Sequence, residues 1–235
     1  HDPLRRQRQM CIRDRGYDVG TSGHGNFNLI PCPTGEYVYG VHYTPYTSGG
    51  GGQANPGTVF QYATDGSGYA TFFLGQYEYD YRGYQCLTIA DDGSYILLSQ
   101  GEKIFKIDTS TAWAGGADNQ DRVQHTWELP DSRNYNDYRY NEQLRVNSIA
   151  ILPDGSRAYA AMNYNNAPTS ADIPGGKMNA FAVLNLQTPA LPVITSLQGA
   201  GGTNIQPNWV AAAPDSSAVY VANRRSATDL IWRVG

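Results

Sequence analysis

A repeat of about sixty residues is the feature that most constrains the fold of this chain. Each of its four copies contains an apolar run, a tight turn and a second apolar run, over residues 28–43, 86–99, 148–164 and 209–225. The turns fall at Gly35, Gly93, Gly155 and Ser216, which are 58, 62 and 61 residues apart. A third run follows in each copy, over 57–66, 103–111, 179–188 and 229–235, and a fourth lies at 69–75, 125–130 and 192–197.

The chemistry of the turns and runs predicts β-hairpins. Asp-Gly between apolar runs is a strong hairpin signal, and Val, Ile, Tyr and Phe dominate the runs, as they do in strands. No segment has a convincing helical period. Units of four strands repeated at a regular spacing indicate a β-propeller. We therefore expect an all-β fold: a β-propeller with about four blades of four antiparallel strands, forming an incomplete ring.

Two of the units resemble a known repeat. PDGSRAYAA (153–161) and PDSSAVYVAN (214–223) resemble the YVTN-type repeat of lactonase-like β-propellers, and the closest match is YVAN at 220–223. The GTVF segment (57–60) with the turn at 65–66 resembles a second type of tandem propeller repeat. These resemblances imply an architecture rather than an activity. Lactonase-like propellers generally have more than four blades, which is why we expect an incomplete ring here.

The first fifteen residues differ from the rest of the chain. Residues 5–15 read RRQRQMCIRDR and resemble a translated sequencing adapter. We therefore expect residues 1–15 to be non-native, and residues 16–235 to be a propeller fragment assembled from metagenomic reads. Its units lie near 24–83, 84–145, 146–207 and 208–235, the last of them truncated. Without the basic start, the formal charge changes from −4 to −7, which does not indicate a nucleic-acid partner.

Long Tyr-rich connections are expected on one face of the propeller, opposite the Asp-Gly turns. Ten of the 18 Tyr residues lie in these connections, where an Asp-Tyr-Arg triplet occurs twice. Tyr and Arg are typical of binding hot spots, and Tyr offers a flat apolar face with a polar tip. The alternative is that the Tyr residues pack against each other and each Asp pairs with its Arg. The candidate ligand-binding residues are Tyr79, Asp80, Tyr81, Arg82, Asp137, Tyr138, Arg139, Tyr140 and Tyr164.

Side-chain amides recur where the innermost strand of a blade begins. Gln85, Asn147 and Asn208 each stand eight residues before the turn position, at the expected mouth of the channel, whereas Phe27 breaks the pattern in the first unit. A ring of amides can coordinate Ca²⁺ through its oxygens or hold a polar ligand. The alternative is that each amide satisfies a free backbone group at the start of a strand.

Three functions follow from these observations. The first is a non-catalytic propeller, extracellular, cell-surface or periplasmic, that binds a glycan or a protein through the Tyr-rich connections. The second is a lactonase-like hydrolase acting at the channel mouth, and the third is a structural arc of a larger adhesin. No catalytic residue is assigned, because the HExxH, CxxC and GxSxG patterns are absent from the sequence. No apolar run approaches the ~18 residues of a membrane-spanning helix. Cys32 and Cys86 are out of phase on neighbouring strands, so we expect no disulfide between them.

Overall fold

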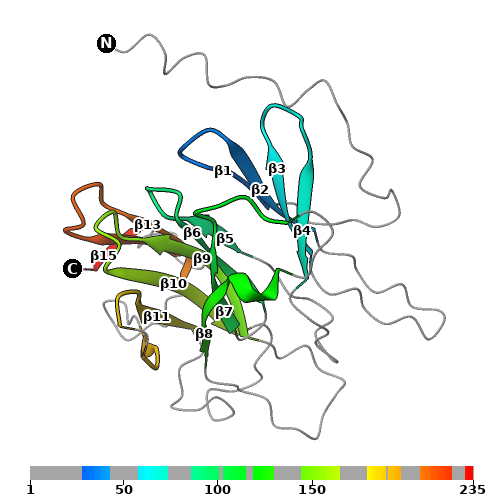
Figure 1. Cartoon of the computed structure of the whole chain (residues 1–235). Coiled ribbons are helices and arrows are strands. Elements are labelled where there is room, and N and C mark those ends of the chain that lie inside the picture. Colours follow the sequence, from blue (N-terminus) through cyan, green and yellow to red (C-terminus); the bar gives the residue numbers. More distant parts are fainter. Residues whose placement is uncertain are drawn as a thin grey trace, which may run out of the picture.

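Four antiparallel sheets follow one another along the chain (Figure 1). The computed structural model describes residues 28–42, 58–73, 86–100, 103–114, 119–129, 144–164, 179–188, 190–196, 207–223 and 231–234. The first sheet contains β1 (Asn28–Pro31), β2 (Tyr37–His42), β3 (Thr58–Ala63) and β4 (Tyr69–Phe73). The second contains β5 (Leu87–Ile89), β6 (Tyr95–Gln100), β7 (Lys103–Asp108) and β8 (Val123–Glu128). The third contains β9 (Leu144–Ile151), β10 (Arg157–Tyr164), β11 (Asn179–Asn185) and β12 (Val193–Ser196). The fourth contains β13 (Pro207–Ala212), β14 (Val219–Asn223) and β15 (Ile231–Val234).

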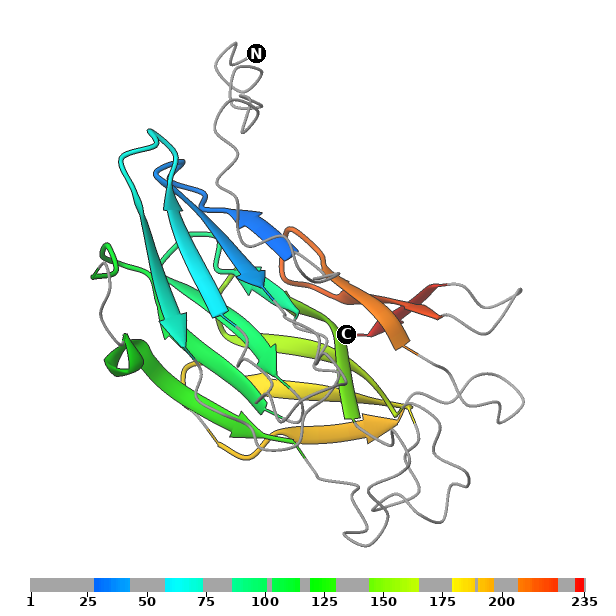
Figure 2. The ribbon, with the colours of Figure 1, turned by 90° about the vertical axis from the view of Figure 1, so that its right-hand side faces the viewer.

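The sheets are arranged as the blades of a propeller, which confirms the predicted fold class. Within each sheet the strands pair in chain order. The first strands of successive sheets pack side by side in the order β1, β5, β9 and β13, and the sheets fan out from them (Figures 1 and 2). The first strand is therefore the innermost strand of each blade. The one helix among the described residues is a single 3-10 turn, η2 (Gln120–Arg122).

The turn of each repeat adopts the conformation that its sequence predicts. Gly35, Gly93 and Gly155 have φ values between +67° and +79°, which L-residues with a Cβ seldom adopt. Ser216 has φ 58° and takes the same place in the fourth blade. The carboxylate of Asp92 accepts a hydrogen bond from the Ser94 amide at 2.9 Å, and Asp154 and Asp215 accept the equivalent bond in the repeat turns of the third and fourth blades. Asp65 accepts the same kind of bond from Ser67 in the turn between β3 and β4. Hydrogen bonds from these serines hold the pKa of each of the four carboxyl groups below its ordinary value.

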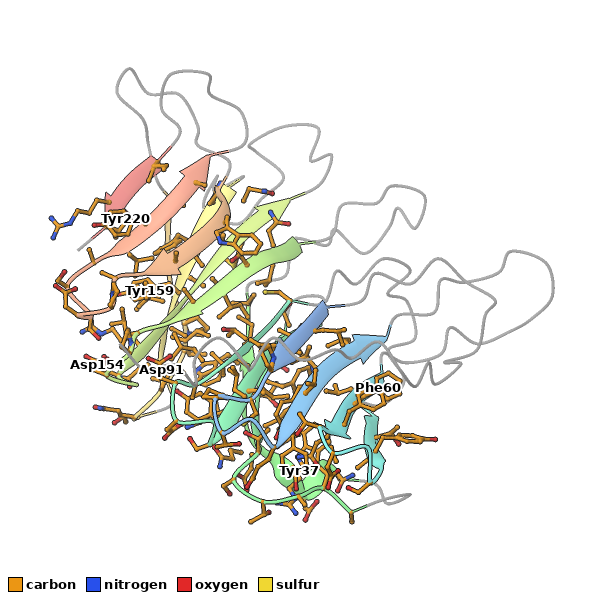
Figure 3. All side chains as sticks on the ribbon, turned by 90° about the horizontal axis from the view of Figure 1, so that it is seen from above. Tyr37, Phe60, Asp91, Asp154, Tyr159 and Tyr220 are labelled. Carbon is orange, nitrogen blue, oxygen red and sulfur yellow. The ribbon has the colours of Figure 1, made fainter. Side chains whose placement is uncertain are left out.

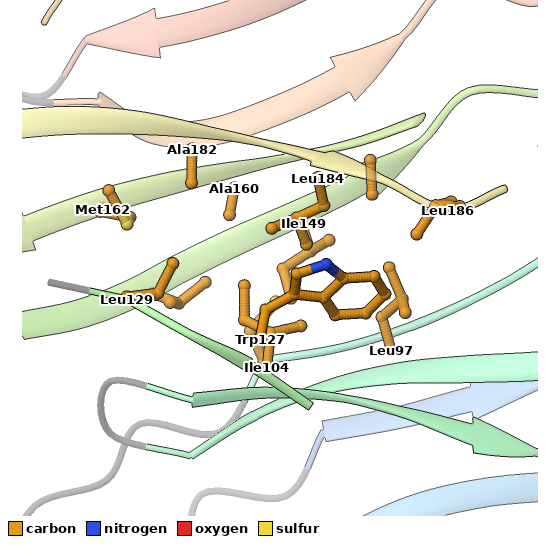
Figure 4. Packing of buried hydrophobic residues seen from close by; sticks show 13 residues of the cluster. Leu97, Ile104, Trp127, Leu129, Ile149, Ala160, Met162, Ala182, Leu184 and Leu186 are labelled. Atoms are coloured by element: carbon orange, nitrogen blue, oxygen red, sulfur yellow. The ribbon is translucent and has the colours of Figure 1, made fainter. Parts of the chain in front are cut away.

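The hydrophobic core lies between the blades. Ile96 and Leu98 face the first blade, while Leu97 between them faces the third, and all three are fully buried. Alternate side chains of a strand point to opposite faces of its sheet, so an inner blade needs apolar residues on both faces. The interface of the second and third blades is centred on Trp127, which packs among aliphatic side chains (Figure 4). Cys32 and Cys86 are buried free thiols, as expected.

The segment between β7 and β8 contacts the first blade. The Trp113 ring packs against Tyr39, with ring centroids 5.5 Å apart, and the Trp113 backbone amide donates to Gln61 Oε1 at 2.8 Å. Gln61 Nε2 in turn donates to the Tyr39 hydroxyl at 3.0 Å, and Asn119 Nδ2 donates to the carbonyl of Thr71 at 2.9 Å. Burial raises the pKa of Tyr39 to about 12, against the opposing effect of the Gln61 bond. A buried polar network therefore joins the first two blades.

Candidate binding face

The strand register places the long connections at one end of the sheets. In the first blade, Asn28 pairs with Val41 and Thr58 pairs with both His42 and Phe73, so β1 begins at the end where β2 and β4 finish. In the third blade, Leu144 pairs with Tyr164 in the same way. Four long connections leave this end, and they span residues 43–57, 74–85, 130–143 and 165–178. We call it the loop end, and the opposite end, which holds the Asp-Gly turns, the turn end.

Most of the residues expected to bind a ligand lie outside the described residues. This applies to the following members of the predicted set: Tyr79, Asp80, Tyr81, Arg82, Gln85, Asp137, Tyr138, Arg139 and Tyr140. Tyr164 is the last residue of β10 at the loop end, and the structure describes its backbone only. The ligand-binding role of these side chains stays a prediction. What the structure adds is the position of the strands from which their connections leave.

The two described amides both stand at β-bulges. In β9, Ser148 pairs with Ala161 and Val146 with Met162, so Asn147 between them is the extra residue. In β13, Trp209 pairs with Ala222 and Pro207 with Asn223, so Asn208 is extra in the same way. A bulge releases its extra residue from the ladder and redirects the side chain. Two of the three amide positions that the sequence shows therefore correspond to an irregularity of the innermost strand near the loop end.

The bulge in the third blade makes contacts between blades. Asn147 Nδ2 donates to the carbonyl of Pro207 at 3.3 Å. The Ser148 hydroxyl accepts from the Val210 amide at 3.2 Å and donates to the Val210 carbonyl at 3.5 Å. Asn208 is exposed. These side-chain bonds link β9 and β13 near the loop end, because the two strands belong to different sheets and share no backbone ladder.

The chemistry available at this level of the blade is polar rather than acidic or nucleophilic in the part that the structure describes. Burial raises the pKa of the Cys86 thiol to about 12, so this thiol is protonated near neutral pH. Within the described residues, no three His, Cys, Asp or Glu side chains form a group that could hold a metal ion. The Ca²⁺ site expected from the three amides stays a prediction, since Gln85 lies outside the described residues.

The sequence did not predict the bulges or the contacts that residues 109–114 and 119–122 make with the first blade. The sequence sign of the bulge was the amide at a constant distance from the turn, but only the pairing register shows that this residue is extra. The connection from β7 to β8 begins at the turn end, because Asp108 pairs with Tyr95 beside the Gly93 turn. The connection from β7 to β8 is much longer than the equivalent connection in the first blade, at 64–68, and this difference in length is visible in the sequence.

Comparisons with known proteins agree with the fold. The β-propeller domain of Cps50 (Swd1) from Myceliophteria thermophila matches with a TM-score of 0.53 at 12% identity, covering 90% of this chain and 52% of that chain. Hydrazine synthase of Kuenenia stuttgartiensis matches with a TM-score of 0.48 at 15% identity, covering 91% and 46%. The dihydro-heme d1 dehydrogenase NirN matches with a TM-score of 0.48 at 14% identity, covering 77% and 30%. The chain thus spans about half the length of the first two. No family model and no curated protein matches this chain.

Proposed function

We propose that this β-propeller domain is a non-catalytic binding protein that recognises a glycan or a protein through its loop end. The observation that carries the proposal is the register of the first and third blades, which directs the four long connections to one end. The two Asp-Tyr-Arg triplets lie in two of these connections, each leading into an innermost strand. Fold likeness alone does not assign a ligand, so the proposal depends on the loop composition.

Of the two ligand classes, a glycan fits this composition better. Tyr offers a flat apolar surface on which a sugar ring can stack, with a hydroxyl at its edge. Asp, Asn and Arg supply the acceptors and donors that sugar hydroxyl groups need. The turn end differs, because its carboxylates already accept hydrogen bonds from neighbouring serines. We further propose an extracytoplasmic location for the protein, supported by its negative charge and its abundance of Tyr, Asn and Gly. Within the described residues, no helix has the length and apolarity needed to cross a membrane.

Affinity electrophoresis tests this function. The chain is run in native gels that contain soluble xylan, mannan or β-glucan, and the retardation gives an apparent dissociation constant for each polysaccharide. We expect Tyr81→Ala and Tyr138→Ala each to weaken the binding of the retarding polysaccharide by about tenfold, the effect of losing one aromatic hot spot.

Tyr69→Ala is the matched control, because Tyr69 is an exposed aromatic residue at the turn end, where β4 begins. It should bind as the parent does. If none of the polysaccharides retards the chain, the glycan assignment is wrong and a protein ligand is the remaining class. If Tyr69→Ala weakens binding as much as the loop variants do, the loop end is not the binding surface.

A further inference from the structure

Equivalent positions of the repeat define two faces for every blade. The upstream face packs against the preceding blade, and the downstream face packs against the next one. The turn residue sets the equivalence: the residue four positions after it is Tyr39 in the first blade, Leu97 in the second and Tyr159 in the third. Each of these three contributes to the core shared with the next blade. The fourth member of the series is Tyr220.

The fourth blade presents the same downstream residues to solvent. Tyr220 is exposed, whereas Tyr159 lies between the third and fourth sheets (Figure 3). The strand pairing defines a second set of equivalent residues, on the third strand of each blade. In the first three blades these residues are 0% exposed, and in the fourth the residue is 69% exposed. The set is Val59, Ile104, Phe181 and Ile231. Trp209 lies on the same face, because it pairs with Ala222, which in turn pairs with Ile231, and it is 62% exposed.

The first blade shows the reverse pattern on its upstream face. The residue six positions before the turn is buried in three blades, as Leu87, Ile149 and Val210, with 5%, 5% and 3% exposure. Its counterpart Leu29 is 54% exposed. The arc of four blades therefore has an uncovered interface at each end, made of the same positions that form its internal interfaces.

We propose that the downstream face of the fourth blade, formed by Trp209, Tyr220 and Ile231, docks a fifth propeller blade of the same kind. The partner would carry counterparts of Val210, Val219 and Val221, which cover the downstream face of the third blade. The interface already present between those blades is the template, because Ala211, Tyr220 and Ala222 stand where Ala150, Tyr159 and Ala161 stand one repeat earlier. This chain spans only 52% of the Cps50 (Swd1) propeller chain, so about as much again is present in that protein.

A polar contact supports the same partner. Asn147 of the third blade reaches the carbonyl of Pro207 at the bulge of the fourth. Asn208 is its counterpart one repeat later and is exposed. A fifth blade with the same bulge would place a carbonyl where the Asn208 amide can donate to it. The apolar face and the exposed Asn208 amide thus both favour a propeller blade as the partner. A protein without this repeat would supply the apolar contact but not the carbonyl for Asn208.

Appending a copy of residues 186–235 directly after Gly235 tests the proposal. Val219 pairs with Val234 in the fourth blade as Ala158 pairs with Leu184 in the third, so Gly235 is the equivalent of Asn185. The next residue in the repeat is therefore Leu186, where the copy begins. The copy supplies a fourth strand for the fourth blade and a three-stranded fifth blade. We expect the acrylamide quenching of Trp209 to fall about threefold in the extended protein, because a covered side chain leaves the solvent. Its emission should also shift to shorter wavelength. Versions of both proteins with Trp209→Phe isolate the contribution of this residue.

Two variants of the extended protein sharpen the result. Ile231→Asp should restore quenching of Trp209, whereas Leu191→Asp, which changes an exposed leucine outside the face, should not. A change of Val221 to Asp in the appended copy alone should also restore quenching, without altering the original four blades. The proposal is overturned if Trp209 stays equally quenchable in the extended protein. It is also overturned if the chain of 235 residues forms a micromolar dimer that protects Trp209, since a second copy would then be the occupant.

Discussion

Two of the three interfaces between blades share an apolar core and differ in whether hydrogen bonds accompany it. Between the second and third blades, Trp127 and its aliphatic neighbours form an apolar layer. Between the first and second, a hydrogen-bond network through Tyr39, Gln61 and Trp113 accompanies the apolar core. Equivalent positions of one repeat thus accept an apolar contact with or without such a network. The difference teaches that the repeat specifies where blades meet, while the residues that face one another decide whether hydrogen bonds cross the apolar contact.

Replacing Trp127 with Ala should give the largest effect, on the apolar side of this comparison. The change removes a fully buried ring and leaves a cavity, so we expect the free energy of unfolding to fall by about 3–5 kcal/mol. Urea denaturation followed by circular dichroism measures it. Trp209→Ala is the control in the same chain and should cost less than about 1 kcal/mol, because that ring is exposed. Equal losses in the two variants would show that the interface of the second and third blades does not control stability.

Replacing Gln61 with Leu tests the polar side. The change removes the donor to the Tyr39 hydroxyl and the acceptor of the Trp113 amide, while keeping a side chain of similar size. A buried group that loses its partner costs about 1–3 kcal/mol, and we expect a destabilisation of that order in urea denaturation. Adding Tyr39→Phe to Gln61→Leu should recover part of the loss, because the hydroxyl that lost its donor is then gone. A double variant less stable than Gln61→Leu would contradict the role assigned to this network.

Gly93 lies in a turn at the interface of the first and second blades, whereas Gly66 lies in a turn with open space around it. Gly66 and Gly93 have φ values of +77° and +74°, so Ala is strained by about 1–2 kcal/mol at either. At Gly93 a Cβ would also lie 2.9 Å from the sulfur of Cys32 in the first blade, whereas at Gly66 it would meet nothing within 4 Å. We expect Gly93→Ala to lower the thermal midpoint more than Gly66→Ala. Adding Cys32→Ala should reduce that excess, and its persistence would show that the contact with Cys32 is not the cause.

The smallest effect is expected for Tyr95→Phe. The Tyr95 hydroxyl is buried beside the apolar interface and has no hydrogen-bond partner among the described residues. Removing it deletes an unsatisfied group, so the free energy of unfolding should change by less than about 1 kcal/mol or increase. The ring that lies beneath the Lys106 ammonium, 4.3 Å from its centroid, is retained. If Tyr95→Phe lowered the free energy of unfolding as much as Gln61→Leu does, the Tyr95 hydroxyl would have a stabilising partner and this prediction would be wrong.

Local patterns predicted the parts of the fold that depend on neighbours in sequence. The Asp-Gly turns, the strands beside them and the repeat spacing all correspond to the observed blades, because turn chemistry and strand alternation act over a few residues. The bulges at Asn147 and Asn208 were not predicted as bulges, since the extra residue exists only relative to a partner strand. The contact of Trp113 with Gln61 joins residues 52 apart and depends on how two blades pack.

The sequence by itself determined that this chain forms antiparallel blades, where each turn falls, and that the long Tyr-rich connections alternate with tight turns. Only the tertiary structure decided which face of each strand meets which neighbour, that two of the amide positions are bulges, and that Leu29, Trp209 and Ile231 stand on uncovered faces. The physical reason is that hydrogen-bonded turns and side-chain alternation are local, whereas burial depends on the blades on either side. A residue type repeated at one position can therefore be buried in three blades and exposed in the fourth.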